Sequence, residues 1–170
     1  MITEADIVLR IQQSLSSPFG RVLVALVARW LIFLYVPFAL LIKRSKLYVD
    51  AVYAAGWTAL LALTMSTVLA QLIGRVRPYL AVPGVEAIVP PNIQSGSFPS
   101  SHTAVAVGIA VALSSTNVPV GVAAFLVAGL VAFGRVASGM HFPTDLVGGA
   151  AVGVLAFLIV RFVQQSLSQI

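Results

Sequence analysis

The chain of 170 residues has only two histidines, and each lies among residues that could act on phosphate. His102 follows the sequence Phe98-Pro-Ser-Ser, and His141 is followed four residues later by Asp145. One histidine could attack phosphorus while the other protonates the leaving oxygen. A carboxylate that holds one ring nitrogen leaves the other basic, so Asp145 favours His141 as the nucleophile.

Arginines in two further motifs supply a complementary charge. Arg75 and Arg77 follow Gly74, and Arg135 lies six residues before His141. Guanidinium groups are planar forks that match phosphate oxygens. Ser100 is expected to cap the N-terminus of the next helix, whose free backbone N–H groups also suit an anion. The combination predicts a phosphate site.

Each motif alone has an ordinary explanation, because histidines at helix ends usually pack or face solvent and arginines at membrane boundaries usually snorkel to head groups. Two histidines and a carboxylate could also ligate a metal, but Arg77 and Arg135 would repel a cation. We therefore expect no metal and no cofactor. The chain has no cysteine, which excludes disulfides and thiolate chemistry.

The composition indicates a protein embedded in a bilayer. Hydrophobic residues make up 59% of the chain and charged residues only 9%, whereas a soluble domain is about one quarter charged. The net charge of +5 could suggest nucleic acid, but the basic residues are scattered rather than gathered on one face. A lipid partner is favoured and a nucleic acid is not.

Apolar runs predict an all-α, polytopic membrane bundle in a single domain, residues 1–170. A membrane-spanning helix needs about 20 mostly apolar residues. The five predicted spans are Val22 to Ile42, Ala51 to Ile73, Ser101 to Ser115, Val118 to Val136, and Asp145 to Phe162. The N-terminus, Met1 to Asp6, is acidic and is not followed by an apolar core before Arg10, so it does not look like a cleaved signal peptide; the segment from Thr3 to Ser17 precedes the first span. Its possible capping box and its Ile7, Ile11 and Leu15 predict an amphipathic helix on the membrane surface.

Basic residues orient the predicted bundle. Five crossings place Lys43, Arg44, Lys46 and Arg161 on one side, which the positive-inside rule makes cytoplasmic. The histidines and arginines of the predicted phosphate site fall on the other, extracytoplasmic side. This predicts an integral protein of a bacterial inner or plasma membrane.

These motifs resemble the type 2 phosphatidic acid phosphatase superfamily of membrane lipid phosphatases, relatives of the vanadium haloperoxidases. The family pattern is Lys-x6-Arg-Pro, Pro-Ser-Gly-His and Ser-Arg-x5-His-x3-Asp. Over roughly residues 30–162, the matching positions are Arg77, Pro78, Pro99, Ser100, His102, Arg135, His141 and Asp145.

The resemblance implies a role for each matched residue. It makes His141 the nucleophile that forms a phosphohistidine, Asp145 its orienting residue and His102 the general acid. Phosphate would be held, without a metal, by Arg77, Arg135, Ser100 and the backbone at Ser101.

The chain departs from the family pattern at three positions: Ala70 for the lysine, Ser101 for the glycine and Gly134 for the serine. Arg75 could replace the missing lysine as a phosphate ligand, or activity could be weakened.

Within the superfamily the chain resembles undecaprenyl-diphosphate phosphatases of the bacitracin-resistance type, which also lack the lysine. The shared features are Arg77-Pro-Tyr79, Val89-Pro90 and Ser97-Phe-Pro-Ser-Ser-His102. This implies a role in cell-wall biogenesis, recycling a lipid carrier at the outer face of the membrane. Phosphatidylglycerol phosphate, phosphatidate and lipid A phosphate remain alternative substrates, and haloperoxidase activity or non-catalytic binding of a lipid phosphate remain alternative functions. The oligomeric state is not indicated.

Two further features have open interpretations. The segment from Gly74 to Ser100 is long for a loop, and either lids the phosphate site, with Tyr79 and Ile88 touching the lipid, or is a stiff connector. Arg29 lies inside the first predicted span, where a charge is costly. Snorkelling could bring it to the surface, so Arg29 is not assigned to the site.

Overall fold

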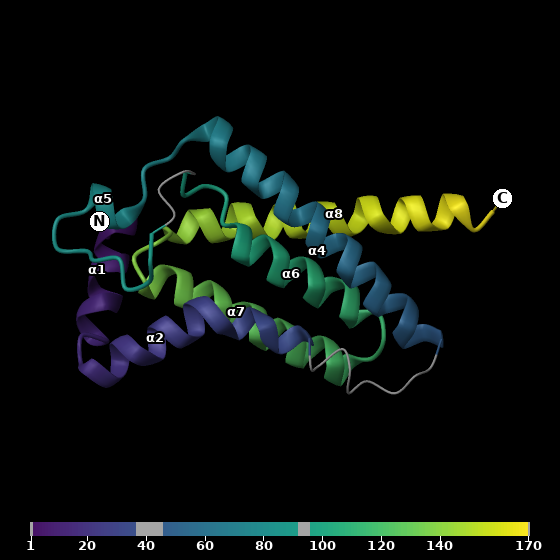
Figure 1. Ribbon diagram of the computed structural model, residues 1–170, viewed down its shortest axis with the longest axis horizontal. Coiled ribbons are helices and arrows are strands. Elements are labelled where there is room, and N and C mark those ends of the chain that lie inside the picture. Colours follow the sequence, from purple (N-terminus) through teal and green to yellow (C-terminus); the bar gives the residue numbers. More distant parts are fainter. Residues whose placement is uncertain (1, 37–45, 92–95, 170) are drawn as a thin grey trace.

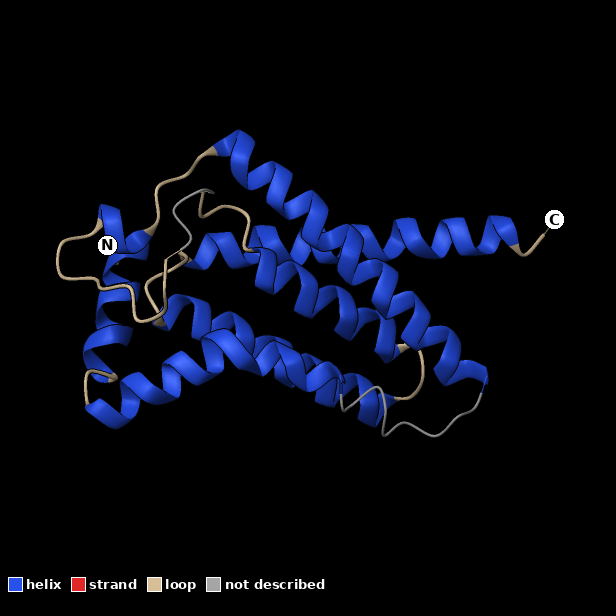
Figure 2. Ribbon diagram, viewed as in Figure 1, coloured by secondary structure: helices blue, strands red, loops and turns tan. Residues whose placement is uncertain are grey.

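The computed structural model describes residues 2–36, 46–91 and 96–169, which are helical without any strand. In chain order the elements are α1 (Glu4–Ser14), α2 (Pro18–Trp30), the 3-10 helix η1 (Leu31–Leu34), α4 (Lys46–Ile73), α5 (Pro78–Ala81), α6 (Ser101–Ser114), α7 (Val118–Ala137) and α8 (Pro143–Leu167). Figures 1 and 2 show α2, α4, α6, α7 and α8 running lengthwise, with α1 across one end.

The predicted helices agree with the observed bundle, with differences at their ends. Among the described residues, three helices are long and apolar enough to cross a membrane; they include α4, α7 and α8, and α6 is a shorter apolar helix. The last helix begins two residues before Asp145 and extends five residues past Phe162. Of the first predicted span, α2 and η1 are observed, while its end lies outside the described residues, as do Lys43, Arg44 and the side chain of Lys46.

Helix α1 has the predicted capping box, in which Thr3 and Asp6 each bond the other's backbone N–H. Its packing against the protein depends on a residue outside the predicted apolar pattern. Val8 is fully buried and, with Leu9 and Ile11, packs against the rest of the protein, whereas Ile7 is exposed. The four-residue spacing that predicted the helix therefore did not identify the residue that anchors it.

Glycines bring α6 and α8 into backbone contact. A Cβ atom on Gly149 would lie 2.6 Å from the Ser100 carbonyl oxygen, and one on Gly153 would lie 2.3 Å from the Ala104 carbonyl oxygen. Small residues permit such close helix packing in lipid. The contact holds the N-terminus of α6 beside that of α8, where Ser100 N–H donates to the Asp145 carbonyl at 3.0 Å.

We predict that Gly153→Ala destabilises the protein, because the added methyl group must push α6 and α8 apart. The melting temperature in detergent should fall by roughly 3–10 °C. Gly129→Ala in α7 is the matched control, since a Cβ there meets nothing within 4 Å and alanine favours helix. Equal melting temperatures for the two variants would contradict the close contact.

Candidate active site

The backbone turn between α7 and α8 holds His141. Backbone N–H groups of Met140 and His141 both donate to the Arg135 carbonyl, at 3.2 Å each. Gly139 makes this turn possible with a φ of +73°. A Cβ atom at this position would lie only 2.4 Å from the Glu86 carbonyl oxygen, so a glycine is needed there. Any side chain at position 139 would therefore displace His141.

One hydrogen bond determines which ring nitrogen of His141 is reactive. Its Nδ1 lies 2.7 Å from the Ser97 carbonyl oxygen. A carbonyl can only accept, so Nδ1 carries the proton and the neutral ring keeps its lone pair on Nε2. Nε2 faces Arg77, whose nearest nitrogen is 3.4 Å away. The ring thus directs a nucleophilic nitrogen toward a cation.

Asp145 is fully buried and its two oxygens have different partners. Oδ2 accepts from the Phe142 backbone N–H at 2.8 Å and lies 3.6 Å from His141 Nδ1, which is too far for a hydrogen bond. Oδ1 accepts from Arg75 at 2.6 Å. The structure therefore brings Asp145 next to His141, as the sequence indicated, but the Ser97 carbonyl is the direct acceptor.

The side chain of Arg75 is directed to Asp145 and away from the cavity that His141 lines. It also donates to Thr144 Oγ1 at 2.7 Å and to Glu4 Oε2 at 3.1 Å, and it stacks on the Phe142 ring. Ala70, at the family lysine position, is buried, and its carbonyl accepts from Gly96 N–H. This arrangement supports a positioning role for Arg75 instead of the predicted phosphate contact.

Two buried arginines flank His141. Arg77 donates to the carbonyl oxygens of Met140 and Gly96, at 3.1 Å each. Arg135 donates to the Ala28 carbonyl at 3.2 Å, while its Nε is buried without a partner among the described residues. An unpartnered buried donor is costly, and an anion bound beside it would remove that cost.

The N-terminus of α6 brings in the remaining predicted residues. Ser100 is buried and is the N-cap, as predicted, with its hydroxyl accepting from Thr103. The next two residues, Ser101 and His102, line the same cavity as His141, Arg77 and Arg135. Ser100 itself does not line it, so its hydroxyl acts as the cap of the helix.

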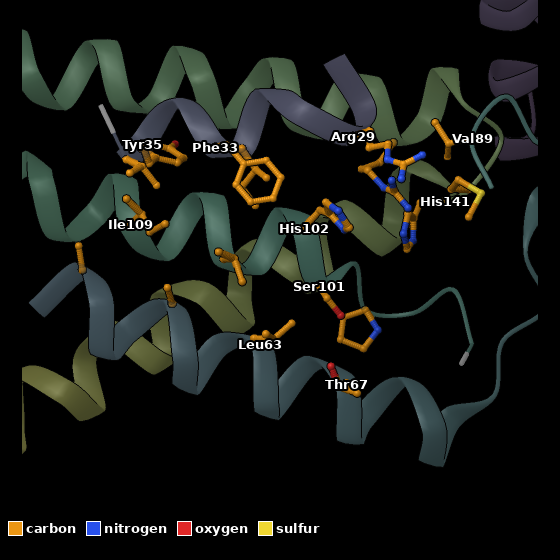
Figure 3. A pocket seen from close by; sticks show the side chains of 18 of the residues that line it. Arg29, Phe33, Tyr35, Leu63, Thr67, Val89, Ser101, His102, Ile109 and His141 are labelled. Atoms are coloured by element: carbon orange, nitrogen blue, oxygen red, sulfur yellow. The ribbon is translucent and has the colours of Figure 1, made fainter. Parts of the chain in front are cut away.

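The cavity has a volume of about 1040 Å³ and a polar and an apolar end. His102, His141, Arg29 and the two flanking arginines make the polar end. The apolar end is lined by residues from η1, α4 and α6, including Phe33, Val52, Leu63, Ile109 and Leu113. Figure 3 shows Tyr35 and Ile109 at one end of the cavity and His141 at the other.

The long segment between α4 and α6 contributes to this cavity through other residues than those predicted. Val89, Pro90 and Gly96 line it, whereas Tyr79 and Ile88 do not. Tyr79, in α5, packs against the hydrophobic clusters around Val136 and Met140. The predicted lipid contacts of Tyr79 and Ile88 therefore do not fit their positions.

Sequence reasoning missed Ser97 as the acceptor for His141, Glu4 as a partner of Arg75, and Arg29 as a cavity residue. Ser97 acts through its carbonyl, which no side-chain pattern can reveal. Glu4 is 71 residues from Arg75, and no local spacing relates the two. Arg29 did carry a signal, namely a charge within an apolar run, and the structure places it at the cavity.

Burial and charge together keep His141 neutral. The pKa of His141 is lowered from 6.5 to about 4, chiefly by burial and also by Arg135 and Arg77, while Asp145 acts in the opposite direction. A neutral imidazole at physiological pH keeps the Nε2 lone pair available. No group of three or more His, Cys, Asp and Glu side chains in the described part of the chain is arranged to hold a metal.

Comparison with known proteins identifies the family. The sequence model that describes the PAP2 superfamily matches residues 50–168 of this chain. This chain belongs to the PAP2 superfamily. Its helices that are long and apolar enough to cross a membrane make it an integral membrane protein.

Two relatives carry the name BcrC. The chain is 30% identical over 109 residues to undecaprenyl-diphosphatase BcrC of Bacillus subtilis strain 168, covering 64% of this chain and 55% of that protein. It is 29% identical over 114 residues to the bacitracin transport permease protein BcrC of Bacillus licheniformis, covering 65% and 56%. The chain thus spans little more than half the length of these relatives.

A solved structure shares the fold. LpxE of Aquifex aeolicus is similar with a TM-score of 0.71 and 23% identity, over 91% of this chain and 92% of that one. At this identity the likeness shows that the helices are arranged alike, and it carries no statement about substrate.

We predict that Arg75→Gln lowers kcat by about 10- to 100-fold and leaves KM for the lipid nearly unchanged, because Arg75 holds Asp145 and does not line the cavity. Glu4→Gln should act in the same direction but more weakly. Steady-state kinetics in detergent measure both constants, with Arg10→Gln on the exposed face of α1 as control. A rise in KM with constant kcat would instead make Arg75 a phosphate ligand.

We also predict that stability falls with acid because of His141. Its pKa is lower in the folded state, so the unfolded chain binds a proton first as pH falls from about 6.5 to about 4. The stabilisation is complete above pH 6.5 and is lost across this window. Melting temperatures measured from pH 7 to pH 5 should therefore fall more steeply for the wild type than for His141→Gln, and parallel curves would contradict the assignment.

Proposed function

We propose that this chain is a metal-independent lipid phosphatase that removes the terminal phosphate of a polyprenyl diphosphate, undecaprenyl diphosphate in particular, through a phosphohistidine on His141. The observation that carries the proposal is that one cavity is lined at its polar end by two histidines and buried arginines and extends to a long apolar end. The 30% identity to undecaprenyl-diphosphatase BcrC supports this choice of substrate.

The first chemical step is phosphoryl transfer to His141. Its Nε2 attacks the terminal phosphorus, and an N–P bond forms as the bond from that phosphorus to the bridging oxygen breaks. His102 donates its proton to this oxygen, so lipid monophosphate leaves. Arg77 and Arg135 offset the charge that develops on the oxygens of the transferred group.

The second step is hydrolysis of the phosphohistidine. The now neutral His102 takes a proton from a water molecule, whose oxygen attacks phosphorus and breaks the N–P bond. Inorganic phosphate is released, and both histidines return to their starting states. Throughout, the Ser97 carbonyl holds the Nδ1 proton, so that Nε2 is the nitrogen that gains and loses the phosphoryl group.

The proposed side of the membrane is the extracytoplasmic one. The site lies where α7 ends and where α6 and α8 begin. Arg161 lies near the C-terminal end of α8. Figure 1 shows this end of α8 at the opposite end of the bundle from α1. Basic residues favour the cytoplasmic side. This supports a site that meets lipid diphosphates in the outer leaflet.

The test is release of inorganic phosphate by purified protein in detergent, with a chelator and no added metal. Undecaprenyl diphosphate should be preferred to phosphatidylglycerol phosphate and phosphatidate. His141→Ala should lower kcat by at least about 1,000-fold and His102→Ala by about 10²- to 10⁴-fold, while Arg161→Ala, a control far from the cavity, should remain active. Vanadate should inhibit the wild type.

Other results would redirect the proposal. Preference for phosphatidate or phosphatidylglycerol phosphate would change the substrate and keep the mechanism. Activity that survives in His141→Ala would exclude the phosphohistidine. Folded protein that releases no phosphate from any lipid would indicate a non-catalytic lipid-phosphate binder, with Ala70 in place of a lysine as the departure to examine.

A further inference from the structure

Arg29 lines the cavity together with Arg77 and Arg135, and no acidic residue of the described part of the chain does. It comes from α2, while Arg77 precedes α5 and Arg135 lies near the end of α7. Figure 3 shows Arg29 at the same end of the cavity as His141 and His102. Three cations from three different elements therefore face one space.

Contacts between α2 and α7 hold Arg29 in this place. The residue before it, Ala28, accepts a hydrogen bond from the Arg135 guanidinium at 3.2 Å. Gly134 allows the two helices to approach, since a Cβ there would lie 3.0 Å from the Ala28 nitrogen. The backbone at Arg29 is thus held next to a phosphate-binding candidate, while the Arg29 side chain itself is exposed.

Arg29 is not neutralised by the described part of the protein. The Arg29 guanidinium carbon lies 5.3 Å from the centre of the Trp30 ring. No side chain or carbonyl of the described residues forms an ion pair or hydrogen bond with the guanidinium. A charge within an apolar segment is costly and usually marks function. Arg77 and Arg135, in contrast, donate to backbone carbonyls, those of Met140 and Ala28 respectively.

The cavity continues from Arg29, near the end of α2, along η1 and the residues that follow it. Ile32 and Phe33 of η1 and Val36 just beyond it all line the cavity. A ligand with its reacting phosphate at His141 and its apolar tail along Phe33 must pass Arg29 between the two.

We propose that Arg29 binds the non-reacting phosphate of a lipid diphosphate, the one next to the tail, and so makes this site select diphosphates over monophosphates. The proposal rests on the lipid phosphatase function proposed above. A monophosphate places its only phosphate at His141 and leaves Arg29 without a charged partner. A diphosphate satisfies both positions, and charge-assisted bonds of this kind are the strong ones.

The kinetic test compares farnesyl diphosphate with farnesyl monophosphate, which share one tail. Arg29→Gln should lower kcat/KM for the diphosphate by about 10- to 100-fold and change the monophosphate value less than about threefold. Arg29→Lys should recover part of the difference because it restores the charge. Arg10→Gln, which removes an exposed cation outside the cavity, is the control and should alter neither substrate's value.

Two results would overturn the proposal. Equal losses on both substrates would place Arg29 at the reacting phosphate or in the fold, and unchanged values for both would make it a cation that reaches the membrane surface. Melting temperatures of the variants separate loss of fold from loss of binding.

A binding measurement keeps this test independent of turnover. Farnesyl methylenediphosphonate and farnesyl phosphonate cannot lose their terminal phosphorus by the proposed reaction, and their dissociation constants can be measured for wild type and Arg29→Gln. A wild-type preference for the diphosphonate that disappears in Arg29→Gln supports the proposal, even if no lipid is hydrolysed and the phosphatase function fails. Equal affinities in the wild type would overturn it.

Discussion

The hydrogen bond from His141 Nδ1 to the Ser97 carbonyl is the interaction on which the site depends. It fixes the tautomer, and therefore decides that Nε2 faces the cavity with its lone pair. Ser97 is itself fully buried, and its backbone N–H donates to the Arg75 carbonyl at 2.8 Å. The segment before α6 is thus tied to the segment after α4, and the histidine between α7 and α8 is tied to both.

The electrostatic design follows from placing a neutral histidine between two cations. Arg135 and Arg77 lower the pKa of His141 in addition to burial, and Asp145 opposes them without taking the proton. Removing the carboxylate would leave the arginines without a nearby opposing charge. Arg75, bonded to both Asp145 and Glu4, in turn keeps that buried carboxylate paired, so the balance extends from the cavity to helix α1.

The sequence predicted the elements well where a physical pattern determined them. Continuous apolar runs gave α4, α6, α7 and α8, and Ser100 as a cap and Pro143 at the start of α8 were both recognisable from local chemistry. It could not predict contacts made by backbone carbonyls, such as Ser97 and Met140, or pairings across the chain, such as Glu4 with Arg75. Arg75 shows the limit of prediction from sequence. Its residue type and spacing suggested a phosphate ligand, but only the tertiary structure reveals that its guanidinium already bonds Asp145.

The part of the chain before the family match, which begins at residue 50, contributes directly to the site. Glu4 reaches Arg75 and Thr144, while Gln12 donates to the Glu86 carbonyl and so holds the segment that packs against Gly139. Ala28 accepts from Arg135, and Arg29 faces the cavity. The histidines and their arginines can be read from the family motifs, but the groups that fix their geometry come from α1 and α2. Differences between members of such a family in what they bind can therefore arise from these N-terminal helices while the motif residues stay the same.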